Sequence, residues 1–181
     1  MLDDLKPAGS RKHTFIKGDT HWNHYGALLA FNALMEGNGL PPLPEEALRF
    51  VDLECNGDLA SKIGEKTSTR YGTLINKNFN RVDFNEVNNI GQRIIYENND
   101  KNLPTLVLFR DSFTTHQLEM FAAKFSRVVC LWQPNIDYGI VRQEMPDYVI
   151  SQHVERFFVR CPDDRFGLSH LEYEKQKKAA S

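Results

Sequence analysis

Three continuous apolar runs mark the second half of the chain. They cover residues 105–109 (TLVLF), 127–132 (RVVCLW) and 147–151 (DYVIS), and segments with helical apolar spacing separate them. Strands of a parallel sheet are apolar throughout, because the connecting helices bury both faces of the sheet. The pattern therefore predicts an α/β fold with a mainly parallel sheet. Ligand sites in such folds lie beyond the carboxyl ends of the strands.

The first half of the chain has a weaker pattern. Residues 13–17 (HTFIK) are a candidate strand, and residues 23–36 have the apolar spacing of a helix that ends at a glycine. Residues 50–103 are rich in Asn, Gly and Thr, which favours irregular structure with short strands. We expect one domain over residues 13–166, with a lead-in at 1–12, an irregular, β-rich insert at 50–103 and a frayed polar tail at 167–181.

Charge and composition exclude several classes of protein. The chain has 181 residues, with 22 Lys and Arg against 24 Asp and Glu, so its net charge is −2. We expect no nucleic-acid partner, because binding through phosphates needs an excess of cations. Three cysteines without a C-x-x-C pair exclude a disulfide scaffold and a cysteine zinc site, and no motif predicts a cofactor. Cys130 lies in an apolar run, which predicts a buried thiol.

The sequence also bears on location. No apolar run reaches the ~18 residues that a membrane helix needs. The first ten residues, MLDDLKPAGS, are acidic and lack the apolar core of a signal peptide. We therefore expect either a cytoplasmic protein or a piece cut from a longer exported one.

Ser112 is the first candidate for chemistry. It follows the run at 105–109 and precedes a helical segment, so its hydroxyl should lie at the carboxyl edge of the sheet. Backbone N–H groups at a helix start can stabilise an oxyanion there. A serine hydroxyl needs a base to become a nucleophile. The alternative is that Ser112 caps the helix, a role that Asp111 would fill equally well.

The segment Asp19-Thr20-His21-Trp22 could supply that base. Side chains two residues apart in extended backbone point the same way, about 6.6 Å apart. The Asp19 carboxylate can then bind one His21 ring nitrogen and leave the other to take a proton. In the alternative, Asp19 caps the next helix and His21 packs at the sheet edge. A third interpretation, a metal site formed with His24, matches no strong zinc signature, and we expect no metal.

Longer motifs around these residues resemble a known family. KGDTHWNHYGALLAFNAL resembles the D-T-H-W-N-x-x-G-A motif of the alginate O-acetyltransferase AlgX/AlgJ group, which are SGNH-hydrolase-like proteins. NGDLA at 56–60, LVLFRDSF at 106–113 and PDYVISQHVERF at 146–157 resemble further elements of that group, in the same order. The resemblance covers about residues 13–160.

The resemblance implies a mechanism and a setting. Ser112 would be the nucleophile, His21 the base and Asp19 the residue that orients it, in an order permuted relative to ordinary SGNH hydrolases. The implied fold is a three-layer α/β sandwich with a flavodoxin-like sheet, which we expect this chain to hold in a form incomplete at the N-terminus. The implied activity is acetyl transfer to or from hydroxyls of an exported polysaccharide. The implied location is periplasmic or otherwise extracytoplasmic, beside a membrane-bound O-acyltransferase that supplies acetyl groups.

Some positions depart from the family or have no clear match in it. Arg110 stands where the group usually has glycine, and it could narrow the site, help to hold an anionic intermediate, or mark a protein that has lost activity. The second oxyanion donor has no clear match, and Asn135 and Gln152 are positional candidates for substrate binding.

Aromatic and cationic side chains extend the list of candidate substrate contacts. Trp22, Trp132 and Tyr138 could stack on sugar rings, although such aromatics are more often core residues. Arg156 could bind an anionic uronate, or it could pair with a neighbouring carboxylate.

Three functions stay open at this point. The first is a polysaccharide O-acetyltransferase that uses Asp19, His21 and Ser112. The second is a carbohydrate acetyl-esterase with the same triad, in which water attacks the acyl-enzyme. The third is a non-catalytic glycan-binding or assembly module of a polysaccharide export complex, which Arg110 favours.

Overall fold

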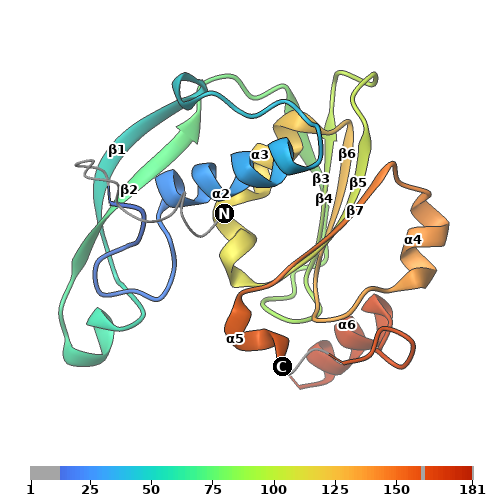
Figure 1. Cartoon of the computed structure of the whole chain (residues 1–181). Coiled ribbons are helices and arrows are strands. Elements are labelled where there is room, and N and C mark those ends of the chain that lie inside the picture. Colours follow the sequence, from blue (N-terminus) through green and yellow to red (C-terminus); the bar gives the residue numbers. More distant parts are fainter. Residues whose placement is uncertain (1–12, 160–161, 181) are drawn as a thin grey trace. The chain divides into compact units, whose positions relative to one another are not determined.

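The computed structural model describes residues 13–159 and 162–180 (Figure 1). Its contacts group the chain into two compact units, Met1–Asn76 and Lys77–Ser181. The predicted single domain over residues 13–166 stays a prediction. Within the described residues, every helix is too short or too polar to cross a bilayer.

The first unit combines one long helix with a two-stranded antiparallel hairpin. Its elements are α2 (His24–Gly37), η1 (Glu45–Ala47), β1 (Leu48–Cys55), η2 (Ala60–Ile63) and β2 (Thr67–Leu74). Asn23 caps α2 through a 2.9 Å bond from Gly26 N to its side-chain oxygen. The predicted helix at 23–36 is confirmed, and α2 buries Ala27, Leu28 and Phe31. The helix contacts β2, whereas much of the hairpin is exposed.

The second unit contains a five-stranded sheet in the order β3-β4-β6-β5-β7. Its strands are β3 (Phe79–Phe84), β4 (Arg93–Asn98), β5 (Thr105–Arg110), β6 (Arg127–Trp132) and β7 (Tyr148–Gln152). Strands β5, β6 and β7 are parallel, as their apolar runs predicted. Strand β4 is antiparallel to both β3 and β6. The sheet is therefore mixed, and the expectation of a mainly parallel sheet is not confirmed.

Connections between the strands explain the mixed pairing. Parallel neighbours need a long crossover, which α3 (Leu118–Lys124) and α4 (Tyr138–Glu144) provide after β5 and β6. The link from β3 to β4 holds no helix, so the two strands form an antiparallel pair. The predicted irregular insert at 50–103 thus contains most of β1 and all of β2, β3 and β4.

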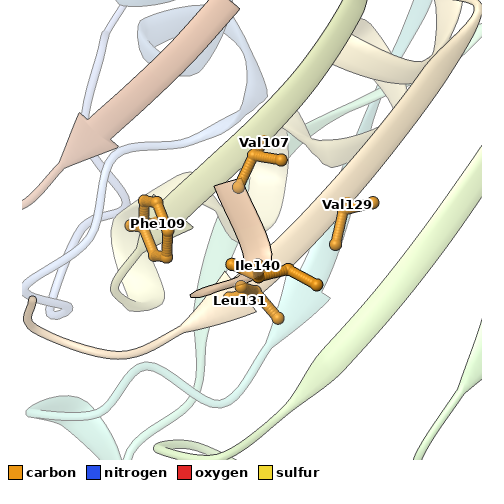
Figure 2. Packing of buried hydrophobic residues seen from close by; sticks show 5 residues of the cluster. All are labelled: Val107, Phe109, Val129, Leu131 and Ile140. Carbon is orange, nitrogen blue, oxygen red and sulfur yellow. The ribbon is translucent and has the colours of Figure 1, made fainter. Parts of the chain in front are cut away.

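Helices lie on both faces of this sheet, with α3 and α4 on opposite sides (Figure 1). On the α4 face, Ile140 packs against a buried cluster of alternate residues from the two central parallel strands (Figure 2). These residues are Val107, Phe109, Val129 and Leu131, each at most 1% exposed. Cys130 is also buried, as predicted, and burial raises the pKa of its thiol to about 12.

Two local predictions need correction. The HTFIK segment forms no regular strand, because the chain turns back at Gly18 and makes only an isolated bridge between Phe15 and Trp22. The polar tail contains helix α6 (His170–Ala179) instead of fraying. Ser169 caps this helix with a capping box, and the Tyr173 hydroxyl donates to Asn135 Oδ1 at 3.0 Å. The polar sequence of α6 gives no apolar periodicity from which the helix could be predicted, because the helix is held by these polar contacts.

Candidate functional site

The first unit holds the Asp19–His21 pair. Asp19 Oδ1 lies 2.8 Å from His21 Nδ1 and accepts a second bond from the His21 backbone N–H, also at 2.8 Å. The predicted contact between the two side chains is therefore present. A carboxylate at Nδ1 favours the tautomer that protonates this nitrogen, so Nε2 is the atom through which the ring would accept a proton.

The loop at 56–60 holds this pair in place. Asp58 N donates to Asp19 Oδ2 at 2.8 Å, and Thr20 N donates to Asp58 Oδ1 at 2.8 Å. The Thr20 hydroxyl donates to Asp58 Oδ2 at 2.5 Å. Gly57 allows this approach, since a Cβ there would lie 2.4 Å from Gly18 O. The sequence resemblance pointed to the NGDLA segment but did not reveal that Asp58 orders the Asp19 turn.

These hydrogen bonds also set the charge of Asp19. Burial raises its pKa, but bonds from the backbone of His21 and Asp58 and from the His21 ring outweigh burial and hold the pKa below 3.8. Asp19 is therefore a carboxylate at neutral pH. It can stabilise a proton on the His21 ring, as a base in acyl transfer requires.

The metal interpretation involved His24, which is not part of the cluster that forms. Ligand atoms of Asp19, His21 and Asp58 lie within 4.8 Å of one another, but His24 is not among them. His24 packs against the Tyr71 ring instead, at 4.4 Å between centroids. Each oxygen of the two carboxylates already accepts a hydrogen bond from the protein. We interpret the cluster as a network that orients the histidine.

Ser112 lies in the second unit, at the carboxyl edge of the parallel strands. Strand β5 ends at Arg110, and Ser112 begins the 3-10 helix η3 (Ser112–Gln117). Asp111, rather than Ser112, caps η3 by accepting from Phe113 N at 2.8 Å. Its other oxygen accepts from Val154 N at 2.7 Å, which ties the turn to the chain after β7. Ser112 itself is half-buried.

The buried side chain of Arg110 holds this turn by hydrogen bonds from inside the protein. Its side chain is buried, with 2% exposed, and its guanidinium lies 4.0 Å from the centre of the Trp132 ring. Nη1 donates to Asp111 O at 3.0 Å and to Thr115 Oγ1 at 3.2 Å, and Nη2 donates to Gln92 Oε1. Burial lowers the pKa of Arg110 to about 10. With these contacts the guanidinium packs inside the protein and offers little surface to a substrate.

Gln152 and Asn135 have internal partners. Gln152 pairs in register with Arg110 at the sheet edge, and its side chain donates to Gln117 Oε1 at 2.7 Å. Asn135 is 1% exposed and donates to Leu168 O at 3.1 Å while it accepts from Tyr173. Its side-chain bonds therefore anchor the segment before α6, so a role as an oxyanion donor gains no support.

The remaining candidates divide by exposure. Trp22 is buried, with 6% exposed, which fits the core alternative and leaves little ring surface for a sugar. Tyr138 is 49% exposed. Arg156 is exposed and lies over the Phe113 ring at 5.4 Å, next to Ser112. Within residues 13–159 and 162–180 Arg156 forms no ion pair, so the alternative of a pair with a neighbouring carboxylate is not observed.

Comparisons with known proteins reveal likeness in structure only. No family model matches the chain, and no curated protein matches it. A DHHW family protein from Eubacterium siraeum is similar in structure, with a TM-score of 0.64 and 13% identity over 82% of this chain. PatB1 from Bacillus cereus gives a TM-score of 0.59 and 17% identity over 83% of this chain.

At these identities the likeness shows a shared fold. This chain spans 61% of the Eubacterium siraeum protein and 65% of PatB1, so it matches less than two thirds of either. The O-acetyltransferase domain of Pseudomonas putida AlgJ is also similar, at 17% identity over 99% of this chain and 66% of that one. Its TM-score of 0.45 is too low to support a conclusion.

Proposed function

We propose that this chain carries the site of an SGNH-hydrolase-like O-acetyltransferase acting on hydroxyls of an exported polysaccharide. Ser112 is the nucleophile, His21 the general base and Asp19 the residue that orients it. The Asp19–His21 pair carries the proposal, because Asp19 Oδ1 binds Nδ1 at 2.8 Å and the Asp58 loop holds the carboxylate in place. The helices on both faces of the mixed sheet fit the three-layer sandwich that this mechanism accompanies in the resembling family.

The proposed reaction has two steps. Ser112 Oγ attacks the carbonyl carbon of an acetyl ester while His21 Nε2 takes the hydroxyl proton. The C–O bond to the leaving alcohol breaks, the alcohol takes the proton from His21, and an acetyl-serine remains. A sugar hydroxyl then attacks this ester, gives its proton to His21, and leaves as the O-acetyl sugar while Ser112 regains a proton. Asp19, ionised throughout, stabilises the imidazolium that forms in each step.

The same steps with water as the acceptor describe an acetyl-esterase. Both reactions pass through the acetyl-serine, so only the acceptor separates them. A non-catalytic glycan-binding role is favoured by Arg110, whose buried side chain occupies the place of the usual glycine under the Ser112 turn. In the setting we propose, the protein works outside the cytoplasmic membrane and receives acetyl groups through a membrane-bound O-acyltransferase.

Covalent labelling tests the proposal. A PatB1 structure is described with a sulfonyl adduct, which makes a sulfonyl fluoride a suitable probe. We expect a sulfonyl fluoride to modify Ser112, and we expect Ser112→Ala and His21→Ala to lose both labelling and release of p-nitrophenol from its acetyl ester. Ser151 is an exposed serine on β7, so Ser151→Ala is the matched control. This variant should keep the labelling and the ester turnover of the parent chain.

Two results decide between the candidate functions. Retained ester turnover in Ser112→Ala would contradict the proposal. Mass spectrometry of products, with and without an oligosaccharide acceptor, separates acetyl transfer from hydrolysis. An unreactive Ser112 together with oligosaccharide binding would favour the non-catalytic role.

A further inference from the structure

The NGDLA segment carries an asparagine that the proposed mechanism does not use. Asn56 is exposed and directly precedes Gly57, in the loop that orders the Asp19 turn. Asparagine is a chemically labile residue, and a following glycine makes it more so, because no Cβ hinders the approach of the next backbone nitrogen to the side-chain amide. The sequence holds a second pair of this kind, Asn38 and Gly39, which allows an internal comparison.

Hydrogen bonds hold the Asn38 pair away from reaction. The Asn38 side-chain nitrogen donates to Leu34 O at 2.8 Å, and Gly39 N donates to Glu36 O at 3.0 Å. The amide that would be attacked and the nitrogen that would attack it are therefore both fixed at the end of helix α2. Reaction at Asn38 must first break these bonds.

The Asn56 pair lacks this protection. Among the residues that the structure describes, the Asn56 side chain forms no hydrogen bond and Gly57 N has no acceptor. The loop is held by other groups, since Gly57 O accepts from Ser61 N at 2.9 Å and Asp58 N donates to Asp19 Oδ2 at 2.8 Å. The attacking nitrogen and the attacked amide are thus left free, and water reaches the exposed side chain.

Deamidation is the reaction that this pair can undergo. Gly57 N bonds to Asn56 Cγ and loses its proton, the bond from Cγ to the side-chain nitrogen breaks, and that nitrogen leaves with the proton as ammonia. Water then opens the cyclic imide that remains. Opening at Cγ yields aspartate, whereas opening at the main-chain carbonyl yields isoaspartate, in which the backbone runs through Cγ and is longer by a methylene. The net change consumes water and releases ammonia.

A longer backbone at this point disrupts the bonds that order Asp19. Asp58 N donates to Asp19 Oδ2 at 2.8 Å, and Ala60 N donates to Gly18 O at 2.9 Å. Gly57 packs so closely that a Cβ there would lie 2.4 Å from Gly18 O, so the loop has no room for an added methylene. Isoaspartate formation therefore shifts the donors that follow it away from their acceptors.

We propose that Asn56 is a site of spontaneous deamidation, and that isoaspartate formed there releases the Asp19 turn. The modification itself needs only the Asn56 pair, whereas the loss of activity that follows from it rests on the proposed function. Because Gly57 N must lose a proton to form the imide, the reaction becomes faster as the pH rises.

Ageing of the full chain in mildly alkaline buffer at body temperature tests the site. Trypsin cuts after Arg49, so mass spectrometry follows Asn38 and Asn56 in separate peptides. We expect the Asn56 peptide to gain the mass that separates an acid from an amide at least tenfold faster than the Asn38 peptide. Asn56→Gln should abolish this gain, because its longer side chain forms the cyclic imide far more slowly. Asn38→Gln is the matched control and should age at Asn56 as the parent does.

Hydrogen exchange tests the structural consequence without any activity. The amides of Asp58, Leu59 and Ala60 all donate to acceptors in the Asp19 turn. They should exchange at least tenfold faster in aged parent chain that contains isoaspartate than in fresh chain, and aged Asn56→Gln should keep its protection. Fresh Asn56→Asp, which adds the charge without lengthening the backbone, should also stay protected.

Two results would overturn the proposal. Modification of Asn56 that is absent, or no faster than that of Asn38, would contradict the site. Unchanged exchange at residues 58–60 in chain that contains isoaspartate would contradict the release of the turn. Turnover of p-nitrophenyl acetate keeps this proposal apart from the proposed function: turnover that falls in step with isoaspartate in the parent but not in Asn56→Gln would support both, whereas fresh chain that forms isoaspartate on ageing but never hydrolyses the ester would contradict only the proposed function.

Discussion

Asp19 and Asp137 each bind the ring of a different histidine, and the surroundings of the two pairs differ. Asp19 binds His21 Nδ1 at 2.8 Å, and Asp137 lies 3.0 Å from His170 Nδ1. Asp137 also caps α4 and accepts from the backbone of His170, so it joins the starts of two helices. Asp19 instead orders a turn beside Gly18, which lines a polar groove of about 520 Å³. An Asp–His pair thus suggests proton transfer only where its neighbours leave room for a substrate.

Replacement of Asp19 by Asn tests its role at the residue scale. The amide keeps the shape of the side chain but removes the charge and the preference for a proton on His21 Nδ1. We expect kcat/KM for p-nitrophenyl acetate to fall by about 10³- to 10⁴-fold while the fold is retained. Steady-state kinetics with a circular dichroism control measure this, and activity within threefold of the parent would show that Asp19 does not orient a base.

Gly26 and Gly37 form a matched pair in helix α2. A Cβ at Gly26 would lie 2.1 Å from Thr14 O, whereas nothing lies within 4 Å of a Cβ at Gly37. Gly26→Ala should lower the free energy of unfolding by about 1–3 kcal/mol through overpacking. Gly37→Ala should leave it unchanged or raise it by up to about 1 kcal/mol, because alanine is the better helix former. Urea unfolding measures both, and equal effects would contradict the close contact with Thr14.

At the scale of elements, short polar contacts decide which segments dock. Asp137 joins α4 to α6, Tyr173 reaches Asn135, and Asp111 joins the η3 turn to Val154. Each contact unites segments that are distant in sequence. These polar contacts hold elements with little apolar surface, such as α6, against the rest of the second unit.

Stability of this docking should depend on pH through Asp137. Burial raises the pKa of Asp137, but bonds from His170, Gly139 and Ile140 outweigh it and hold the pKa below 3.8. A lowered folded-state pKa stabilises the protein above the unfolded value of about 3.9, and this contribution disappears as the pH falls through the folded-state pKa.

Asp137→Asn keeps a capping side chain but has no charge to titrate. We expect it to lower the free energy of unfolding by about 1–2 kcal/mol at pH 6. The difference from the parent should shrink as the pH falls from 5 to 2.5. Denaturant unfolding across this range provides the measurement, and a difference that is constant with pH would exclude the ionised carboxylate as its source.

At the scale of the whole molecule, burial differs strongly between the central strands of the second unit and the hairpin of the first unit. Strands β5 and β6 form the centre of the sheet, and their core residues are at most 1% exposed. The β1–β2 hairpin leaves Val51, Leu53 and Tyr71 between 40% and 46% exposed. The second unit therefore has an apolar core that is almost fully buried, whereas the hairpin gains little stability from apolar packing.

Hydrogen exchange should reveal this contrast. Amides of β5 and β6 should exchange only through global unfolding, and those of β1 and β2 through local opening with a smaller free energy. Exchange followed by mass spectrometry resolves the two sets, and equal protection in both would show that the hairpin is as stable as the sheet.

The spacing of apolar residues within short segments is enough to predict the parallel strands and the long helix. The apolar runs at β5, β6 and β7 and the helix after Asn23 follow from neighbours a few positions apart. The Asp19–His21 contact was also predictable, since the two residues lie two positions apart. The hairpin strands β1 and β2 carry no such periodic signal, because most of their residues are exposed or only partly buried.

The sequence by itself thus determined the parallel strands, the strand-end position of Ser112 and the pairing of Asp19 with His21, because each rests on short-range spacing. Only the tertiary structure decided that β4 is antiparallel, that Asp58 orders the Asp19 turn, that Arg110 is buried under Ser112, and that Gly57 packs against Gly18. These features join residues far apart in the chain, and whether a polar side chain is buried, paired or open to a ligand depends on what the fold brings beside it.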